Sequence, residues 1–88
     1  MANETQITIN IARGIRQTTS GLQEAVEDNL AHADKSNRQI EVAQTNLLAF
    51  SDLIEYVKKY HLIGTNEVDA LSGNYEMLKT KYLAKRNA

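Results

Sequence analysis

Few side chains in this sequence could carry out covalent or metal chemistry. The chain of 88 residues contains no cysteine and two histidines, His32 and His61. Asp28 lies four residues before His32, so on a helix the two side chains would share one face and could orient each other or bind a metal ion. A catalytic metal commonly has three protein ligands, however, and pairs with this spacing are common on solvated helix surfaces. We therefore interpret Asp28 and His32 as a stabilising surface pair.

The other candidates for catalysis are isolated from one another in the sequence. The four serines lie in no motif that would activate a nucleophile, and the four glycines are scattered rather than grouped in a phosphate-binding loop. His61 precedes Gly64 near an expected helix end, where it would interact with the terminal carbonyl groups of that helix. The sequence predicts a protein that is not an enzyme, with no catalytic residues, no cofactor and no metal ion.

The charges are nearly balanced, with ten basic and eleven acidic side chains and a formal net charge of −1. Such a balance does not produce the one-signed field that attracts a protein to nucleic acid or anionic lipid. Lys79, Lys81, Lys85 and Arg86 gather near the end of the chain, where cations interact favourably with a helix C-terminus. The four tyrosines are interpreted as amphipathic edges of a core or interface rather than as platforms for stacked bases. Nucleic acid is disfavoured as a partner.

No segment of the sequence is predicted to cross or enter a membrane. The longest uninterrupted apolar run, residues 47–50, has four residues, whereas a transmembrane helix needs about 20. The first residues carry an acid where a signal peptide would carry a basic cluster and an apolar stretch. We expect a cytoplasmic protein, with export possible only together with a partner.

The elements that must position these side chains are predicted to be helices. The chain has no proline, and apolar or small residues recur at alternating steps of three and four without a phase change. We call these positions the heptad face. They are Ala12, Ile15, Thr19, Leu22, Val26, Asn29, Ala33, Ser36, Ile40, Ala43, Leu47, Phe50, Ile54 and Val57. This spacing predicts helices over about 10–33 and 36–61 that pack against another helix, as in a coiled coil.

Whether these two helices are continuous is left open by the sequence. Residues 34–39 contain no apolar side chain, and Ser36 followed by Gln39 matches a capping box that would start a new helix. The unbroken heptad period instead favours one helix of about 50 residues, near 75 Å long. One long helix would demand a partner or self-association, whereas a hairpin could bury part of its own heptad face.

A turn is predicted near residues 61–66. Gly64 can adopt the left-handed conformation that ends a helix, and Thr65 or Asn66 can cap the next one, with Glu67 in its first turn. A final helix over about 66–85 follows, in which Gly73 is locally destabilising or marks the close approach of another helix. At the other end, Ile7 to Ile11 alternate with the period of a strand, so we expect an extended lead-in over 1–8, with Thr8 or Asn10 as the first helix cap.

The predicted fold is therefore a single all-α domain over residues 1–88, either an antiparallel helical hairpin or a three-helix bundle. Ile40, Leu47, Phe50, Ile54 and Val57 are expected to face Val68, Leu71, Tyr75 and Leu78. Ile15, Leu22, Val26 and Leu30 would remain as a surplus apolar surface for a partner or a second copy. The complete set of predicted partner-binding residues is Ile15, Leu22, Val26, Leu30, Ile40, Leu47, Phe50, Ile54, Val57, Leu78 and Tyr82.

Three segments together resemble a known bacterial family. They are the Ile-Thr-Ile-Asn at 7–10, the segment 18–25 and the helix 50–60 that is followed by Val68, Leu71 and Tyr75. The sequence resembles the small helical-hairpin proteins of type VII secretion, the Trp-X-Gly superfamily, and more closely the partner proteins encoded beside LXG toxins. The resemblance implies a helical adaptor that binds the helical N-terminal region of a toxin and escorts it to the export machine. The chain lacks Trp-X-Gly and the aromatic-to-acid export signal, which favours a chaperone or adaptor that acts inside the cell.

The sequence thus predicts a non-enzymatic adaptor or chaperone that binds a partner protein by helix packing. One alternative is a small regulatory protein of phage or mobile-element origin that binds and inhibits a host protein or joins a nucleic-acid complex. In a nucleic-acid complex, the basic residues near the end of the chain should matter and affinity should fall steeply with salt. A second alternative is a purely structural oligomer, which would assemble without any partner.

Overall fold

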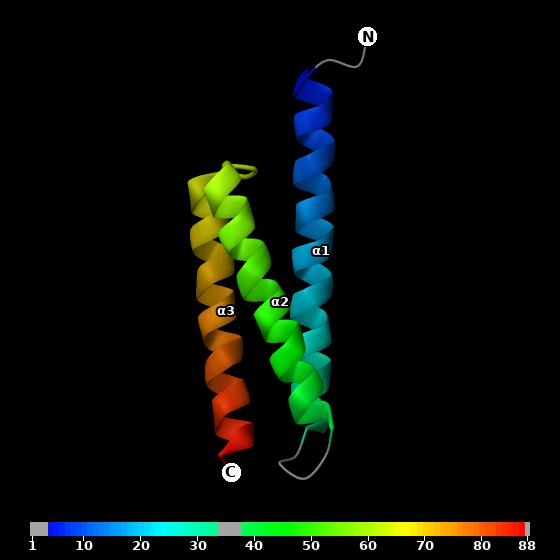
Figure 1. The fold of residues 1–88 in the computed structure, drawn as a ribbon, viewed down its shortest axis with the longest axis vertical. Helices are drawn as coiled ribbons and strands as arrows, with labels where there is room; N and C mark the ends of the chain where they lie inside the picture. The colour runs from blue at the N-terminus through cyan, green and yellow to red at the C-terminus, as the bar shows by residue number, and fades with distance from the viewer. Residues whose placement is uncertain (1–3, 34–37, 88) are drawn as a thin grey trace.

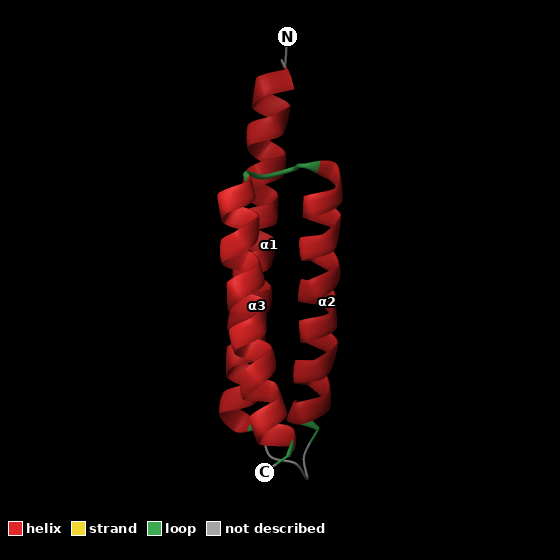
Figure 2. Cartoon of the chain, turned by 90° about the vertical axis from the view of Figure 1, so that its left-hand side faces the viewer, coloured by secondary structure: helices red, strands yellow, loops and turns green. Residues whose placement is uncertain are grey.

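The computed structural model describes residues 4–33 and 38–87, and within them the chain forms three α-helices (Figure 1). These are α1 (Glu4–His32), α2 (Gln39–Tyr60) and α3 (Thr65–Arg86). α1 and α3 run in one direction and α2 runs in the other, as both views show (Figures 1 and 2). The predicted all-α class is confirmed, and the three-helix form is the one that occurs.

The chain turns back between α1 and α2 instead of continuing as one long helix. α1 ends at His32 and α2 begins at Gln39, although the heptad period runs on between them. Ser36, the predicted start of a capping box, lies outside the described residues. Arg38 occupies the cap position of α2 without a side-chain hydrogen bond, and the Gln39 side chain instead accepts a hydrogen bond from Asn29 Nδ2 at 2.9 Å.

The turn predicted near 61–66 is confirmed, but its residues have different roles. His61 has the left-handed conformation, with φ 53° and ψ 44°, whereas Gly64 is extended and precedes the first residue of α3. The backbone N–H groups of His61 and Leu62 both donate to the carbonyl oxygen of Val57. Because Leu62 and Ile63 pack against the core, the chain must leave the axis of α2 at His61, before it reaches the glycine.

The start of the chain differs from the predicted extended lead-in, because α1 begins at Glu4. The predicted cap residues Thr8 and Asn10 therefore lie inside the helix, and Asn10 Oδ1 accepts a hydrogen bond from Gln6 Nε2. A strand needs a neighbouring strand for its backbone groups, and the described residues contain none, whereas a helix satisfies these groups within the segment. As a result, α1 projects beyond the turn between α2 and α3 (Figures 1 and 2).

The core runs along the inner sides of all three helices. Phe50, near the middle of α2, is fully buried, and its ring meets that of Tyr75 on α3 edge to face at a centroid distance of 6.1 Å. No added Cβ at Gly73 would have a neighbour within 4 Å, so close approach of a helix within this chain does not explain that glycine. The structure as a whole is a rod about 54 Å long.

Candidate functional site

The heptad face is buried inside the folded chain. Ten of the eleven predicted partner-binding residues belong to the buried core, and the eleventh, Leu22, is half-buried against it. The surplus surface expected from Ile15, Leu22, Val26 and Leu30 is therefore not exposed. The hairpin folds the heptad face of α1 onto α2, and α3 covers the remainder, so a partner cannot reach most of these side chains in the folded chain.

The described polar residues of the heptad face, Thr19 and Asn29, make hydrogen bonds within the chain. Asn46 Nδ2 of α2 donates to Asn29 Oδ1 of α1 at 2.8 Å, and Asn29 in turn donates to Gln39. Buried Thr19 donates its hydroxyl hydrogen bond to the carbonyl oxygen of Arg16. Polar pairs between packed helices fix their register, because a slipped register would leave the amide groups without partners.

The surface that α1 and α2 share on one side of this register carries no charge. On α1 it follows residues 11, 18, 22, 25 and 29, and on α2 it follows residues 46, 49, 53, 56 and 60, all at helical spacings of three, four or seven. The Asn29–Asn46 hydrogen bond joins the two rows. We call this surface the α1–α2 face. In a chain in which 24% of residues are charged, two adjoining rows without a charge mark it as distinct from the rest of the surface.

Exposed aromatic and aliphatic side chains lie along the α1–α2 face. Tyr56 and Tyr60 are 55% and 53% exposed, with ring centroids 4.9 Å apart, and Ile11 of α1 is 44% exposed. Leu22 and Leu53 are half-buried and lie two turns from the asparagine pair along their respective helices. Because antiparallel helices rise equally per residue, these two leucines lie at one level and the exposed tyrosines lie beyond them.

On its other side α1 meets α3 through charge. The Arg16 guanidinium donates two hydrogen bonds to the Glu67 carboxylate, at 2.9 Å from Nε and 2.6 Å from Nη2. The hydrogen bond from Arg16, together with its positive charge, lowers the pKa of Glu67, while partial desolvation acts in the opposite direction. The same hydrogen bond and the negative charge of Glu67 raise the pKa of Arg16. Glu67 lies in the first turn of α3, so the pair joins the start of α3 to α1.

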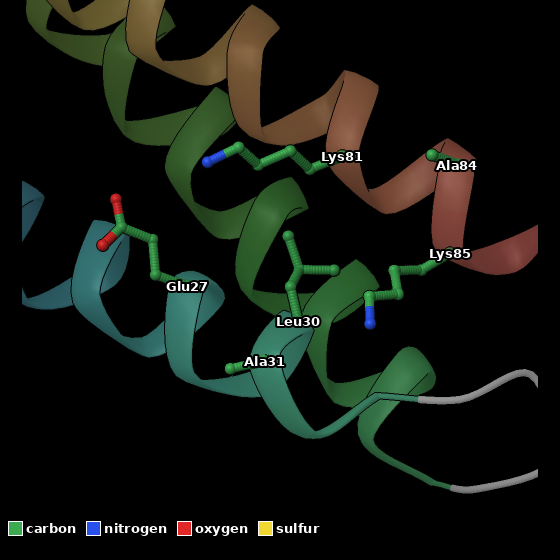
Figure 3. A pocket seen from close by; sticks show the side chains of 6 residues that line it. All are labelled: Glu27, Leu30, Ala31, Lys81, Ala84 and Lys85. Atoms are coloured by element: carbon green, nitrogen blue, oxygen red, sulfur yellow. The ribbon is translucent and has the colours of Figure 1, made fainter.

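Further along, an open groove of about 770 Å³ lies between α1 and α3. Its lining residues are Glu27, Leu30 and Ala31 of α1 and Lys81, Ala84 and Lys85 of α3 (Figure 3). Lys81 and Lys85 extend from α3 across from Glu27, with Leu30 between the two helices. Among the described residues, none of these three charged side chains has an ion-pair partner. We call this feature the α1–α3 groove.

The residues first considered for chemistry lie apart from both surfaces. His32 Nδ1 is 3.6 Å from Asp28 Oδ1 and 3.0 Å from the Asp28 carbonyl oxygen, and both side chains are well exposed. No cluster of three or more potential metal ligands exists among residues 4–33 and 38–87. None of the described helices is long and apolar enough to span a bilayer.

Comparisons of this chain with protein-family models, with curated proteins and with solved structures found no match. The function of the protein must therefore be inferred from the surfaces described above.

The heptad period alone did not reveal the α1–α2 face. All four tyrosines were expected at the edges of a core or interface, but their exposure to solvent differs. Tyr82 is buried and Tyr75 half-buried, whereas Tyr56 and Tyr60 are exposed. A count of charges along each side of the second helix would have indicated this face, because the row 42, 46, 49, 53, 56 and 60 contains none.

Proposed function

We propose that this protein is a non-enzymatic adaptor that binds an amphipathic helix of a partner protein on its α1–α2 face. The observation that carries the proposal is the uncharged double row with Tyr56, Tyr60 and Ile11 exposed on it. Aromatic residues are enriched and charged residues depleted at the centres of protein interfaces. A partner helix with an apolar stripe would cover few charges on this surface; the Lys59 ammonium lies beside it, 5.4 Å from the Tyr60 ring centroid.

A helix is the occupant that fits a surface made by two antiparallel helices. The side chains of the α1–α2 face stand in two rows along the rod, and the space between such rows accepts the ridge of a third helix. Leu22 and Leu53 would contact the middle of that helix, and the two tyrosines would contact one end. The tyrosine hydroxyls can remain in water while the rings are covered.

The resemblance to partners of LXG toxins names the first protein to test. The probe is the purified helical N-terminal region of an LXG toxin from the same genome, and calorimetry measures its affinity for the full chain. Interface tyrosines are frequent hot spots, so Tyr56→Ala should weaken binding about tenfold or more. The variant should retain the helical circular dichroism of the wild type, because Tyr56 is largely exposed.

Leu83→Ala is the matched control, because Leu83 is 40% exposed but lies on α3, away from the α1–α2 face. It should bind the probe as the wild type does. Equal losses in both variants, or the absence of wild-type binding, would contradict the proposal. In the latter case the regulatory alternative would be tested next, through the salt dependence of binding to a host protein or a nucleic acid.

A further inference from the structure

The first turns of α1 extend past the packed part of the bundle. Arg16 pairs with the first turn of α3, and the preceding part of α1 projects beyond the turn between α2 and α3 (Figures 1 and 2). We call residues 4–11 the α1 overhang; it is about 12 Å long at 1.5 Å per residue. Among its described side chains, Ile9 is 46% and Ile11 is 44% exposed. Helix ends open more readily than packed helix interiors, so a partner that covers the overhang would stabilise it.

The α1–α3 groove lies near the opposite end of the rod, and there it is an open space, rather than a helix, that lacks a packing partner. Its apolar residues Leu30, Ala31 and Ala84 lie between the charged rims, and α1 and α3 line an open space that another helix could occupy (Figure 3). The sides of the groove are five residues long on each helix, or about 7.5 Å, so the α1 overhang is long enough to span it.

The flank of α1 that carries Ile9 is the one that faces α3. Residues 9, 16, 20, 27 and 31 follow one side of α1 at spacings of seven and four, and this row contains the Glu67 partner Arg16 and the groove residues Glu27 and Ala31. Ile9 therefore continues the same side of the molecule that contains the α1–α3 groove. Two copies that place these sides together would bring Ile9 of one chain over the groove of the other.

We propose that this side is the interface of a two-fold homodimer in which the α1 overhang of each copy fills the α1–α3 groove of the other. The two-fold axis is perpendicular to the rods, so the copies are antiparallel and each groove receives one overhang. The overhang then runs antiparallel to α1 and α3, which completes an up-down-up-down four-helix bundle at each end of the dimer. Because the exchange is reciprocal, assembly closes at two copies.

The charges of the two surfaces agree with this arrangement. Residues 4–11 contain one acidic and no basic residue, whereas Lys81 and Lys85 on the groove rim have no partner among the described residues. In the antiparallel arrangement the positive end of the overhang dipole also lies beside the negative C-terminal ends of α1 and α3. The groove also carries one acid, Glu27, so its two lysines leave it with a net positive charge opposite the acidic overhang.

A disulfide test exploits the absence of cysteine in the natural chain. In the double variant Ile9→Cys/Ala84→Cys the two thiols lie near opposite ends of a 54 Å rod, so they cannot join within one chain. Mild oxidation should yield a covalent dimer of twice the 9.9 kDa chain mass. The control pair is Ile9→Cys/Leu48→Cys, in which the second thiol lies at an exposed position of α2. It should give little covalent dimer under the same conditions.

The strength of self-association gives an independent measurement by analytical ultracentrifugation. Because the two-fold dimer contains the Ile9 contact twice, Ile9→Asp should raise the dissociation constant about 100-fold. Leu48→Asp should leave it unchanged, and circular dichroism checks that both variants stay helical. A wild-type chain that is monomeric at about 100 µM, a concentration at which even weak dimers form, would overturn the proposal. Equal cross-linking in the test and control pairs would also overturn it. Neither result would affect the test of the proposed α1–α2 face, because the two surfaces share only Ile11 and the variant that tests the face, Tyr56→Ala, lies on α2.

Discussion

α1 meets its two neighbours in different ways. Against α2 it buries its heptad face along most of its length, with the Asn29–Asn46 hydrogen bond as a polar link. Against α3 it makes the Arg16–Glu67 ion pair at one end, and further along the α1–α3 groove lies between the two helices. α1 shares the common core with both neighbours, but the contact with α2 adds a polar link between the helices, whereas the contact with α3 adds an exposed ion pair.

This difference explains why the two sides of α1 present different surfaces. Where α1 packs closely on α2, the flanking residues form the uncharged α1–α2 face, which suits a helix with an apolar stripe. Between α1 and α3, unpaired charges line the rims of a groove with apolar residues between them. One helix thus borders two surfaces of different chemistry, and the following predictions test the contacts that position it.

The largest expected effect is on the core that α2 shares with both neighbours. Phe50→Ala removes a fully buried ring that also meets Tyr75, so it should lower the free energy of unfolding by about 3–5 kcal/mol. Since a chain of this size has about 4–13 kcal/mol in total, this loss is a large share of its stability. Urea denaturation measures the change. Leu48→Ala, an exposed site on the same helix, should change stability by less than about 0.5 kcal/mol. A loss of similar size there would show that burial on α2 is not what holds the helices together.

A smaller effect is expected at the polar link between α1 and α2. Asn46→Ala leaves Asn29 Oδ1 without its donor and should cost about 1 kcal/mol of unfolding free energy. A double-mutant cycle with Asn29→Ala should show a coupling of about 0.5–1.5 kcal/mol, because the single changes remove one shared hydrogen bond. Strictly additive losses would mean that the pair does not contribute to the register of the hairpin.

The smallest effect is expected at the contact between α1 and α3, and it depends on pH. Because Arg16 lowers the pKa of Glu67 in the folded chain, the pair stabilises the fold above the unfolded pKa of Glu67. This contribution is lost as the pH falls through the lower, folded pKa. Glu67→Gln should therefore lower the thermal midpoint slightly at neutral pH, and the difference from the wild type should vanish in acid, once the pH lies below the folded-state pKa of Glu67. A difference that persists in acid would indicate a role other than the ion pair.

Much of the fold could be predicted because local rules and tertiary packing agree along most of the chain. The three-four spacing correctly placed residues such as Phe50, Ile54 and Leu78 at helical core positions. The turn after α2 was predictable from its polar residues, but the left-handed residue was not. A glycine has the lowest cost in that conformation, yet the packing of Leu62 and Ile63 places the reversal at His61.

The candidate surfaces were less predictable, because exposure depends on which helix covers which side. The heptad face was expected to remain partly open, and the hairpin closes it. The α1–α2 face was present in the sequence as rows without charge, but only the hydrogen bond between Asn29 and Asn46 shows that the two rows adjoin. The lead-in was predicted as extended because the residues at 7–11 alternate as in a strand. The prediction was wrong, since such alternation is also compatible with an exposed helix end.

The sequence by itself determined that this chain is helical, which residues lie on the inner side of each helix, and where α2 gives way to α3. These properties follow from local backbone preferences and from a spacing that matches the helical period. The tertiary structure alone decided that the heptad face is buried within the chain, and that the α1–α2 face and the α1–α3 groove are left on the surface. A periodic pattern specifies a side of a helix, but not the helix that will cover it, because that choice depends on contacts between residues far apart in the chain.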